Sequence, residues 1–183
     1  MENQRTRLTK KLLKNALIEL LKSNSIHELS VIKLCNMAEV NRSTFYKYYE
    51  NIYDILADIE YDIIQSSSKY LNNLTNVSDK KLIYNSIDEL LQYIKNNKEI
   101  FHIIVNKEND PYFYNNMFKK LISYLKEQIV IKNIKLENPE YTFSYILSGS
   151  GEMIRYWIQN NCEIPSFSLA KLICDYSFKI IQI

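Results

Sequence analysis

Glycine and proline are scarce in this chain, and their scarcity restricts the folds that it can adopt. Only two glycines and three prolines occur in 183 residues, whereas average usage of roughly 7% glycine would give about 13 glycines. Tight β-hairpins and phosphate-binding loops both need glycine at defined positions. The composition therefore argues against most β architectures and against enzymes that hold a nucleotide in a glycine-rich loop.

Hydrophobic periodicity predicts helices along the chain. In the first of them, one apolar stripe is formed by Leu12, Leu13, Ala16, Leu17, Leu20 and Leu21. The polar segment 72–78 has no such period and predicts a loop. We therefore expect an all-α fold of about nine helices, at residues 8–23, 31–38, 42–48, 52–71, 79–96, 98–106, 111–133, 139–161 and 168–181.

Polar residues at the predicted helix starts are candidate caps. Asn51 and Asp54 have the spacing of a capping box. Asp110 and Asn138 are two other candidates, and each precedes a proline that would occupy the first helical position. The remaining candidates are Ser30 and Asn41.

Charge is unevenly distributed between the two ends of the chain. The net charge is +2, but residues 1–51 carry nine Lys or Arg and five acids, a local balance of +4. An anionic partner is therefore expected at the N-terminal quarter.

Three widely spaced cysteines and two histidines form no zinc-ligand spacing, and we predict no metal and no cofactor. No apolar leader or long apolar span is present, which predicts a cytoplasmic protein that does not contact a membrane.

Residues 30–49, SVIKLCNMAEVNRSTFYKYY, have the proportions of a helix-turn-helix. Val40 is predicted to be buried in the turn, and Phe45 to face the preceding helices. Helical steps of about 100° place four polar side chains along one arc, namely Arg42, Ser43, Tyr46 and Lys47. These groups suit guanine edges and phosphate oxygens, so the arc predicts a DNA-contacting surface. The other interpretation is a solvated helix face.

Residues 8–56 resemble the N-terminal DNA-binding domain of TetR-like (tetracycline-repressor-type) transcriptional regulators. The resemblance includes the Ser-Thr-Phe-Tyr run at 43–46 and the aromatic Tyr49 at the end of the recognition helix. It implies a bacterial, all-helical homodimer. A helix-turn-helix domain at residues 1–51 would bind DNA, and a helical domain at residues 52–183 would bind ligand and form the dimer.

By position, the resemblance implies DNA contacts for eight residues. Ser30 would contact phosphate at the start of the second helix, and Tyr46 and Tyr48 would hold the DNA backbone. Bases or nearby phosphates would be contacted by Asn41, Arg42, Ser43, Thr44 and Lys47. For the basic residues of the first helix, backbone contacts and plain solvation both stay open.

Two positions depart from the family pattern. Glu39 stands where the family has glycine in the turn, so the backbone there must be strained or rearranged. Ile52 replaces the lysine that opens the fourth helix and touches phosphate, which removes one charged contact per subunit. The expected consequence is a shallower salt dependence of DNA binding, by roughly one unit of slope.

Residues 145–176 are similar to the last two helices of TetR-like regulators. Both glycines of the chain, Gly149 and Gly151, lie in this predicted helical region, where each lowers helix stability by about 1 kcal/mol relative to alanine. A close helix crossing would explain them, either within the chain or at the twofold axis of a dimer. For the dimer interface we predict Ser144, Ser148, Gly151 and Arg155.

An aromatic group in the C-terminal part has two interpretations, core packing and the lining of a ligand cavity. The same two interpretations apply to His102, a histidine in an apolar run. The candidate pocket residues are Phe101, His102, Tyr112, Phe113, Phe118 and Trp157.

Together these features predict a non-enzymatic, sequence-specific transcriptional regulator. It would bind a pseudo-palindromic double-stranded operator as a homodimer, act as a repressor, and respond to an unidentified small effector. The alternative is a helical ligand-binding or protein-interaction module with a degenerate DNA-binding head. An enzyme is disfavoured, because no nucleophile–base arrangement or paired acid motif is visible.

Overall fold

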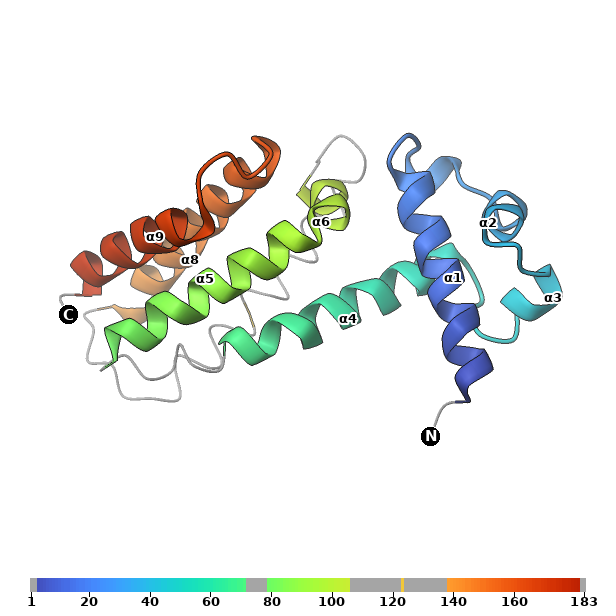
Figure 1. Cartoon of the computed structure of the whole chain (residues 1–183), viewed down its shortest axis with the longest axis horizontal. Helices are drawn as coiled ribbons and strands as arrows, with labels where there is room; N and C mark the ends of the chain where they lie inside the picture. Colours follow the sequence, from blue (N-terminus) through green and yellow to red (C-terminus); the bar gives the residue numbers. More distant parts are fainter. Residues whose placement is uncertain (1–2, 72–78, 106–122, 124–137, 182–183) are drawn as a thin grey trace.

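The computed structural model describes residues 3–71, 79–105, 123 and 138–181, and this part of the chain is all-helical (Figure 1), which confirms the predicted fold class. Apart from residue 123, the predicted helix at 111–133 lies outside the described residues, as do its Asp110 cap and the loop at 72–78. The elements are α1 (Gln4–Leu21), the 3₁₀ turn η1 (Ile26–Glu28), α2 (Val31–Ala38), α3 (Arg42–Phe45), α4 (Ile52–Leu71), α5 (Lys80–Asn96), α6 (Lys98–Val105), α8 (Pro139–Gln159) and α9 (Ser166–Ile181).

Two of the predicted caps form as expected. The Ser30 hydroxyl accepts a hydrogen bond from the Lys33 amide at 3.2 Å and caps α2. At the start of α4, the Asn51 amide donates to the Asp54 carboxylate at 3.1 Å, and the Asp54 amide donates to the Asn51 side chain at 3.3 Å. This reciprocal pair is the predicted capping box.

Asn41 and Asn138 occupy the N-cap positions of α3 and α8, as predicted, but neither caps its helix through the side chain. Neither side chain makes a capping hydrogen bond, although the main-chain oxygen of each accepts from the first turn of its helix. Asn138 has left-handed backbone (φ 50°), whereas a side-chain cap needs extended backbone. Pro139 does occupy the first turn of α8, as expected.

The first helix begins earlier than predicted, because the Asn3 side chain accepts from the Arg5 amide at 3.2 Å. Its apolar stripe is narrower than expected. Leu12 is 42% exposed, whereas the other residues predicted for the stripe are buried: Leu13, Ala16, Leu17, Leu20 and Leu21.

The helices form two groups, a head and a body (Figure 1). The head contains α1, η1, α2 and α3, and α4 runs from it towards the body. In the body, which contains α5, α6, α8 and α9, α5 packs on α9 and on α4, and α8 packs on α6 and α9. Because α1 contacts both α4 and α6, the head rests on two separate elements. One buried hydrophobic cluster extends from α1 through α4 to α9.

A polar contact reinforces the packing of α5 on α9. The Tyr84 hydroxyl donates to the Asp175 carboxylate at 2.5 Å, and this hydrogen bond, with burial, raises the pKa of Tyr84 to about 12. Lys171 pairs with the same carboxylate at 2.5 Å. Among the helices of the described ranges, none combines the length and the apolar character that crossing a membrane requires.

Candidate nucleic-acid interface

The turn between α2 and α3 is built by backbone hydrogen bonds that end α2. The Val40 amide donates to the Cys35 carbonyl at 3.0 Å, and the Glu39 amide donates to the Asn36 carbonyl at 3.3 Å. This is a Schellman motif, in which the residue after the helix takes left-handed backbone. Glu39 occupies that position with φ 53° and ψ 37°. Val40 is half-buried rather than buried, because it lies at the edge of the core.

The recognition segment is held on the head by a buried aromatic pair. Phe45 is 0% exposed and contacts the ring of Tyr49, which is also buried. The α-helix ends at Phe45 rather than at residue 48, because Lys47 and Tyr48 donate to carbonyls three residues back, which gives tighter turns. The chain still coils continuously from Arg42 to Tyr49.

Most of the predicted DNA-contacting side chains lie on the outside of this segment. Tyr46 is 53% exposed, and Asn41, Arg42, Ser43 and Lys47 are exposed as well. Thr44 is half-buried. No acid occurs between residues 40 and 49. The surface therefore combines two cations with hydroxyl and amide groups, the groups that bind phosphate oxygens and base edges.

Ser30 and Tyr48 also have partners within the head. The Ser30 oxygen accepts the α2 capping bond, and its hydroxyl hydrogen can still donate. Tyr48 is half-buried, and its hydroxyl lies 3.4 Å from the Thr6 hydroxyl of α1. The base of the recognition segment is thus joined to the first helix. The Ile52 side chain is buried in the core, so it extends no group towards solvent.

A second polar network joins the recognition segment to α4 and α1, and sequence reasoning missed it. The Tyr49 hydroxyl donates to the Asp58 carboxylate at 2.6 Å. Lys14 of α1 lies 3.1 Å from the same carboxylate and 2.5 Å from Asp62. Burial raises the pKa of Asp58, but the hydrogen bonds from Tyr49 and Lys14 outweigh burial and hold it below its usual value. No local sequence pattern pairs residues so far apart.

The structure describes three of the six candidate pocket residues. Phe101 and Trp157 belong to the buried core, and His102 is half-buried. Phe101 packs edge-on against Tyr93, and the Trp157 indole donates to the Ile164 carbonyl at 2.8 Å. Both contacts are of the kind expected for core residues. The remaining candidates lie outside the described residues, namely Tyr112, Phe113 and Phe118.

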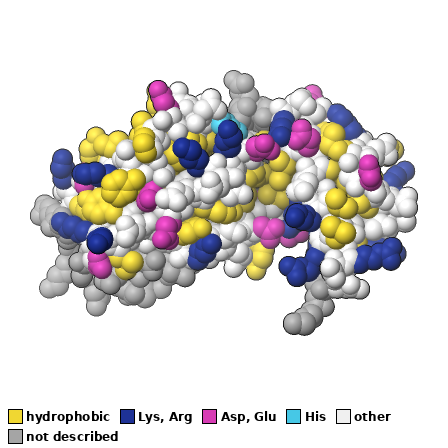
Figure 2. Space-filling view, in the orientation of Figure 1, with side chains coloured by type: hydrophobic (Ala, Val, Ile, Leu, Met, Phe, Trp, Pro, Cys, Tyr) yellow, Lys and Arg dark blue, Asp and Glu magenta, His cyan; other side chains and the backbone are white. Residues whose placement is uncertain are grey.

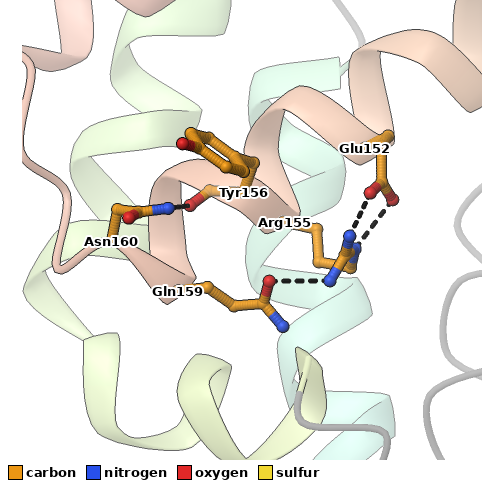
Figure 3. A network of polar contacts seen from close by, with 5 residues as sticks. All are labelled: Glu152, Arg155, Tyr156, Gln159 and Asn160. Atoms are coloured by element: carbon orange, nitrogen blue, oxygen red, sulfur yellow. Dashed lines mark hydrogen bonds and ion pairs between the residues drawn. The ribbon is translucent and has the colours of Figure 1, made fainter.

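The four predicted dimer residues all lie on α8. Ser144 and Ser148 are exposed, whereas Gly151 and Arg155 are half-buried. The Arg155 guanidinium donates through two nitrogens to Glu152 and, at 2.7 Å, to the side chain of Gln159 (Figure 3). This face of α8 therefore carries a preorganised group of charged and amide side chains.

Exposed aromatic and aliphatic residues accompany that group, and sequence reasoning had not selected them. Tyr141 is 80% and Tyr145 71% exposed on α8, and Tyr156 follows on the same face. On α9, Leu172, Tyr176 and Ile180 are exposed at four-residue spacing. Figure 2 shows hydrophobic side chains over the end of the molecule that α9 covers. The i, i+4, i+8 spacing of the three α9 residues is the sequence pattern by which they could have been found.

Comparison with known proteins agrees with this geometry. Residues 82–179, more than half of the chain, match the TetR-type family model for the transcriptional regulator C-terminal region. The transcriptional activator DhaS of the dhaKLM operon of Lactococcus lactis subsp. lactis (strain IL1403) is 25% identical over 120 residues. That alignment covers 63% of this chain and 61% of DhaS, less than two thirds of the relative's length.

Solved structures share the fold. A TetR transcriptional regulator from Streptococcus agalactiae 2603V aligns with a TM-score of 0.69 at 20% identity, covering 95% of this chain and 96% of that one. Thermus thermophilus FadR, a TetR family repressor in complex with lauroyl-CoA, aligns with a TM-score of 0.61 at 13% identity, covering 92% and 93%. The head, the body and the matched C-terminal region thus lead to one conclusion: the chain belongs to the TetR-like family of transcriptional regulators.

Proposed function

We propose that the chain is a sequence-specific repressor that binds a pseudo-palindromic operator as a homodimer and responds to a small ligand in its C-terminal domain. The observation that carries this proposal is the acid-free, exposed face of the recognition segment, with Arg42, Ser43 and Lys47 above the buried Phe45. A solvated face would need no excess of one sign of charge.

The dimensions of the segment support insertion into DNA. The seven residues from 42 to 48 would span about 10 Å at 1.5 Å per residue, and the major groove is about 12 Å wide. Two such segments in a dimer would enter successive major grooves about 34–36 Å apart. Lys and Arg side chains are distributed over the head in Figure 2, as binding to the phosphate backbone requires.

The exposed α8–α9 face supports the homodimer, because apolar patches of this kind mark interaction surfaces. Gly149 adds an independent observation. Within the described part of the chain, a Cβ atom at this exposed helical position would meet nothing within 4 Å, so packing among the described residues does not explain the glycine. A second copy of α8 crossing at this point would explain it, in a four-helix interface formed by α8 and α9 of both protomers.

Introduction of a negative charge on the exposed face of α8 tests the dimer. Tyr145→Glu should convert the protein to monomer, whereas Tyr61→Glu, an exposed tyrosine of α4, should leave the mass at twice the protomer's 21.8 kDa. Sedimentation equilibrium measures both. A wild-type monomer at micromolar concentration would contradict the dimer.

Ligand control is supported by the solved FadR neighbour, which holds lauroyl-CoA. The aromatic candidates described above would line the equivalent site. A ligand that prefers one spacing of the two heads by about 3 kcal/mol would change operator affinity by roughly 150-fold. Release of the operator follows if the preferred spacing does not fit successive grooves.

Operator binding is tested by fluorescence anisotropy with DNA from upstream of the protein's own gene. Arg42→Ala and Lys47→Ala should each weaken binding, and each should reduce the salt slope by about one if the lost contact is to phosphate. Lys81→Ala, on the exposed face of α5, is the matched control and should bind as wild type. If neither recognition variant binds more weakly, the face is misassigned.

The same titration decides the alternative of a ligand-binding or protein-interaction module with a degenerate head. Glu39 and Ile52, where the family has glycine and lysine, are the residues that favour it. That module would bind all DNA weakly and without sequence preference. The direction of control needs a reporter assay, because DhaS is an activator and FadR a repressor. Deletion of the gene should raise expression from the operator's promoter.

A further inference from the structure

A cleft of about 910 Å³ lies where α1 of the head meets α4, α5 and α6. Its walls come from three places: residues 4–18 of α1, residues 58–63 of α4, and the segment from Tyr93 to Ile100. The volume falls within the range of small-molecule sites. Of the predicted C-terminal pocket residues that the structure describes, Phe101, His102 and Trp157, none lines it.

The floor of the cleft is apolar. Ile59 and Ile63 of α4 are buried beneath it, and Ile18 and Ile100 are half-buried at its sides. Leu8, which is 58% exposed, extends the apolar surface along α1. Figure 2 shows hydrophobic side chains at the junction of head and body, with charged side chains beside them.

The rim of the cleft is cationic. Four of its side chains are basic, and all come from α1: Arg7, Lys10, Lys11 and Lys14. Two are acidic, Asp58 and Asp62, so the formal charge of the lining is +2. Both carboxylates are bound by Lys14, and Asp58 also accepts the Tyr49 hydroxyl. Lys14 offsets one of these two negative charges, and the other three basic residues, Arg7, Lys10 and Lys11, against the second carboxylate charge give the lining its excess of +2.

We propose that this cleft binds a small anionic amphiphile, a carboxylate or sulfonate that carries an alkyl or aryl group. The apolar part lies on the isoleucine floor, where burial from water stabilises it. The anionic group lies among Arg7, Lys11 and Lys14. A neutral amphiphile would leave the excess charge uncompensated, and a cationic one would add to it.

The position of the cleft connects it to the proposed operator binding. An anion beside Lys14 competes with Asp58 for the ammonium group, and Asp58 holds Tyr49 at the end of the recognition segment. Occupancy therefore changes operator affinity, and operator DNA changes ligand affinity by the same factor. This coupling rests on the proposed function, whereas binding in the cleft does not.

The site is tested by titration with 8-anilinonaphthalene-1-sulfonate and by displacement of this probe with decanoate or, in a separate titration, with operator DNA. Decanoate should displace the probe, and decyltrimethylammonium, which has the same chain length and the opposite charge, should not. The double variant Arg7→Gln/Lys11→Gln should bind decanoate about tenfold more weakly, as expected for two exposed ion pairs. Leu8→Ser should weaken it as well, because part of the apolar wall is removed. Lys81→Gln, on α5 outside the cleft, should bind as wild type.

Three results would overturn the proposal. Equal displacement by the anion and the cation would show that charge does not select the ligand. Full decanoate affinity in both the double variant and Leu8→Ser would place the ligand elsewhere in the chain. Displacement of the probe by operator DNA but not by decanoate would assign the α1 cations to phosphate. If the protein binds decanoate as expected but does not bind operator DNA, the proposed function is contradicted and the proposal for the cleft stands.

Discussion

Replacement of Glu39 by glycine should make the protein more stable. Glu39 ends α2 with φ 53° and ψ 37°, in the left-handed region that favours glycine. The two hydrogen bonds that close this turn use backbone atoms of residues 35–40, so the substitution leaves both in place. The Glu39 side chain is exposed, and no hydrogen bond or ion pair involving it is seen within the described part of the chain.

Two opposing terms set the size of the effect. Left-handed backbone costs a residue with a Cβ about 1–2 kcal/mol, because Cβ crowds the following carbonyl oxygen. Glycine avoids this cost but gives the unfolded chain more conformational entropy, which costs about 0.5–1 kcal/mol. The expected net gain in the free energy of unfolding is about 0.5–1 kcal/mol.

Urea unfolding at matched protein concentration measures this gain, with two variants as controls. Glu39→Gln removes only the charge, and Glu39→Ala removes the side chain beyond Cβ but keeps the steric cost. Both should unfold at nearly the wild-type urea concentration, whereas Glu39→Gly should require more urea. If glycine and alanine give the same midpoint, backbone strain at this turn is not the cause, and the argument from φ fails.

Three further predictions concern other parts of the chain. Tyr49→Phe should destabilise the protein by about 1–2 kcal/mol at neutral pH, because the carboxylate of Asp58 loses a hydrogen bond. Since the folded-state pKa of Asp58 is lowered, that contribution is present above its ordinary pKa of about 3.9 and is lost as the pH falls through the folded value. The difference in the free energy of unfolding between wild type and Tyr49→Phe, measured by urea unfolding, should therefore become smaller as the pH is lowered from neutral through this range. Gly149→Ala should stabilise the isolated protomer by about 1 kcal/mol, since the added methyl has open space. A loss of stability in a monomeric sample would refute it. All three cysteines should react slowly with a thiol reagent in the native protein and quickly in urea, because each is buried and burial raises its pKa, that of Cys174 to about 12. Rapid native labelling would contradict the buried thiols.

Local interactions explain why the helix boundaries were largely predictable. Ser30 and the Asn51–Asp54 box act within three residues of themselves, so their spacing is visible in the sequence. Asn138 shows the limit of the same reasoning. Its residue type suits a side-chain cap, but its left-handed backbone does not, and residue type alone does not reveal φ.

Packing decided which apolar residues are buried. Leu12 and Leu13 both fit the predicted stripe of α1, yet only Leu13 reaches the core, because α2 and α4 cover one side of the helix. The exposed residues of α8 and α9 show the same limit. Their spacing is that of a core-facing helix, and only the structure shows that no described element of the protomer covers them.

Residue types and their spacings alone predict the helical class, the helix-turn-helix with its basic, acid-free face, and the resemblance to TetR-like regulators. These features depend on residue type and on spacings of a few residues, which local geometry converts directly into structure. Only the tertiary structure brought Lys14, Tyr49 and Asp58 together and formed the cleft between α1 and α4. Such contacts depend on the angle at which the head meets the body. That angle is set by packing summed over many side chains, and no short motif records it.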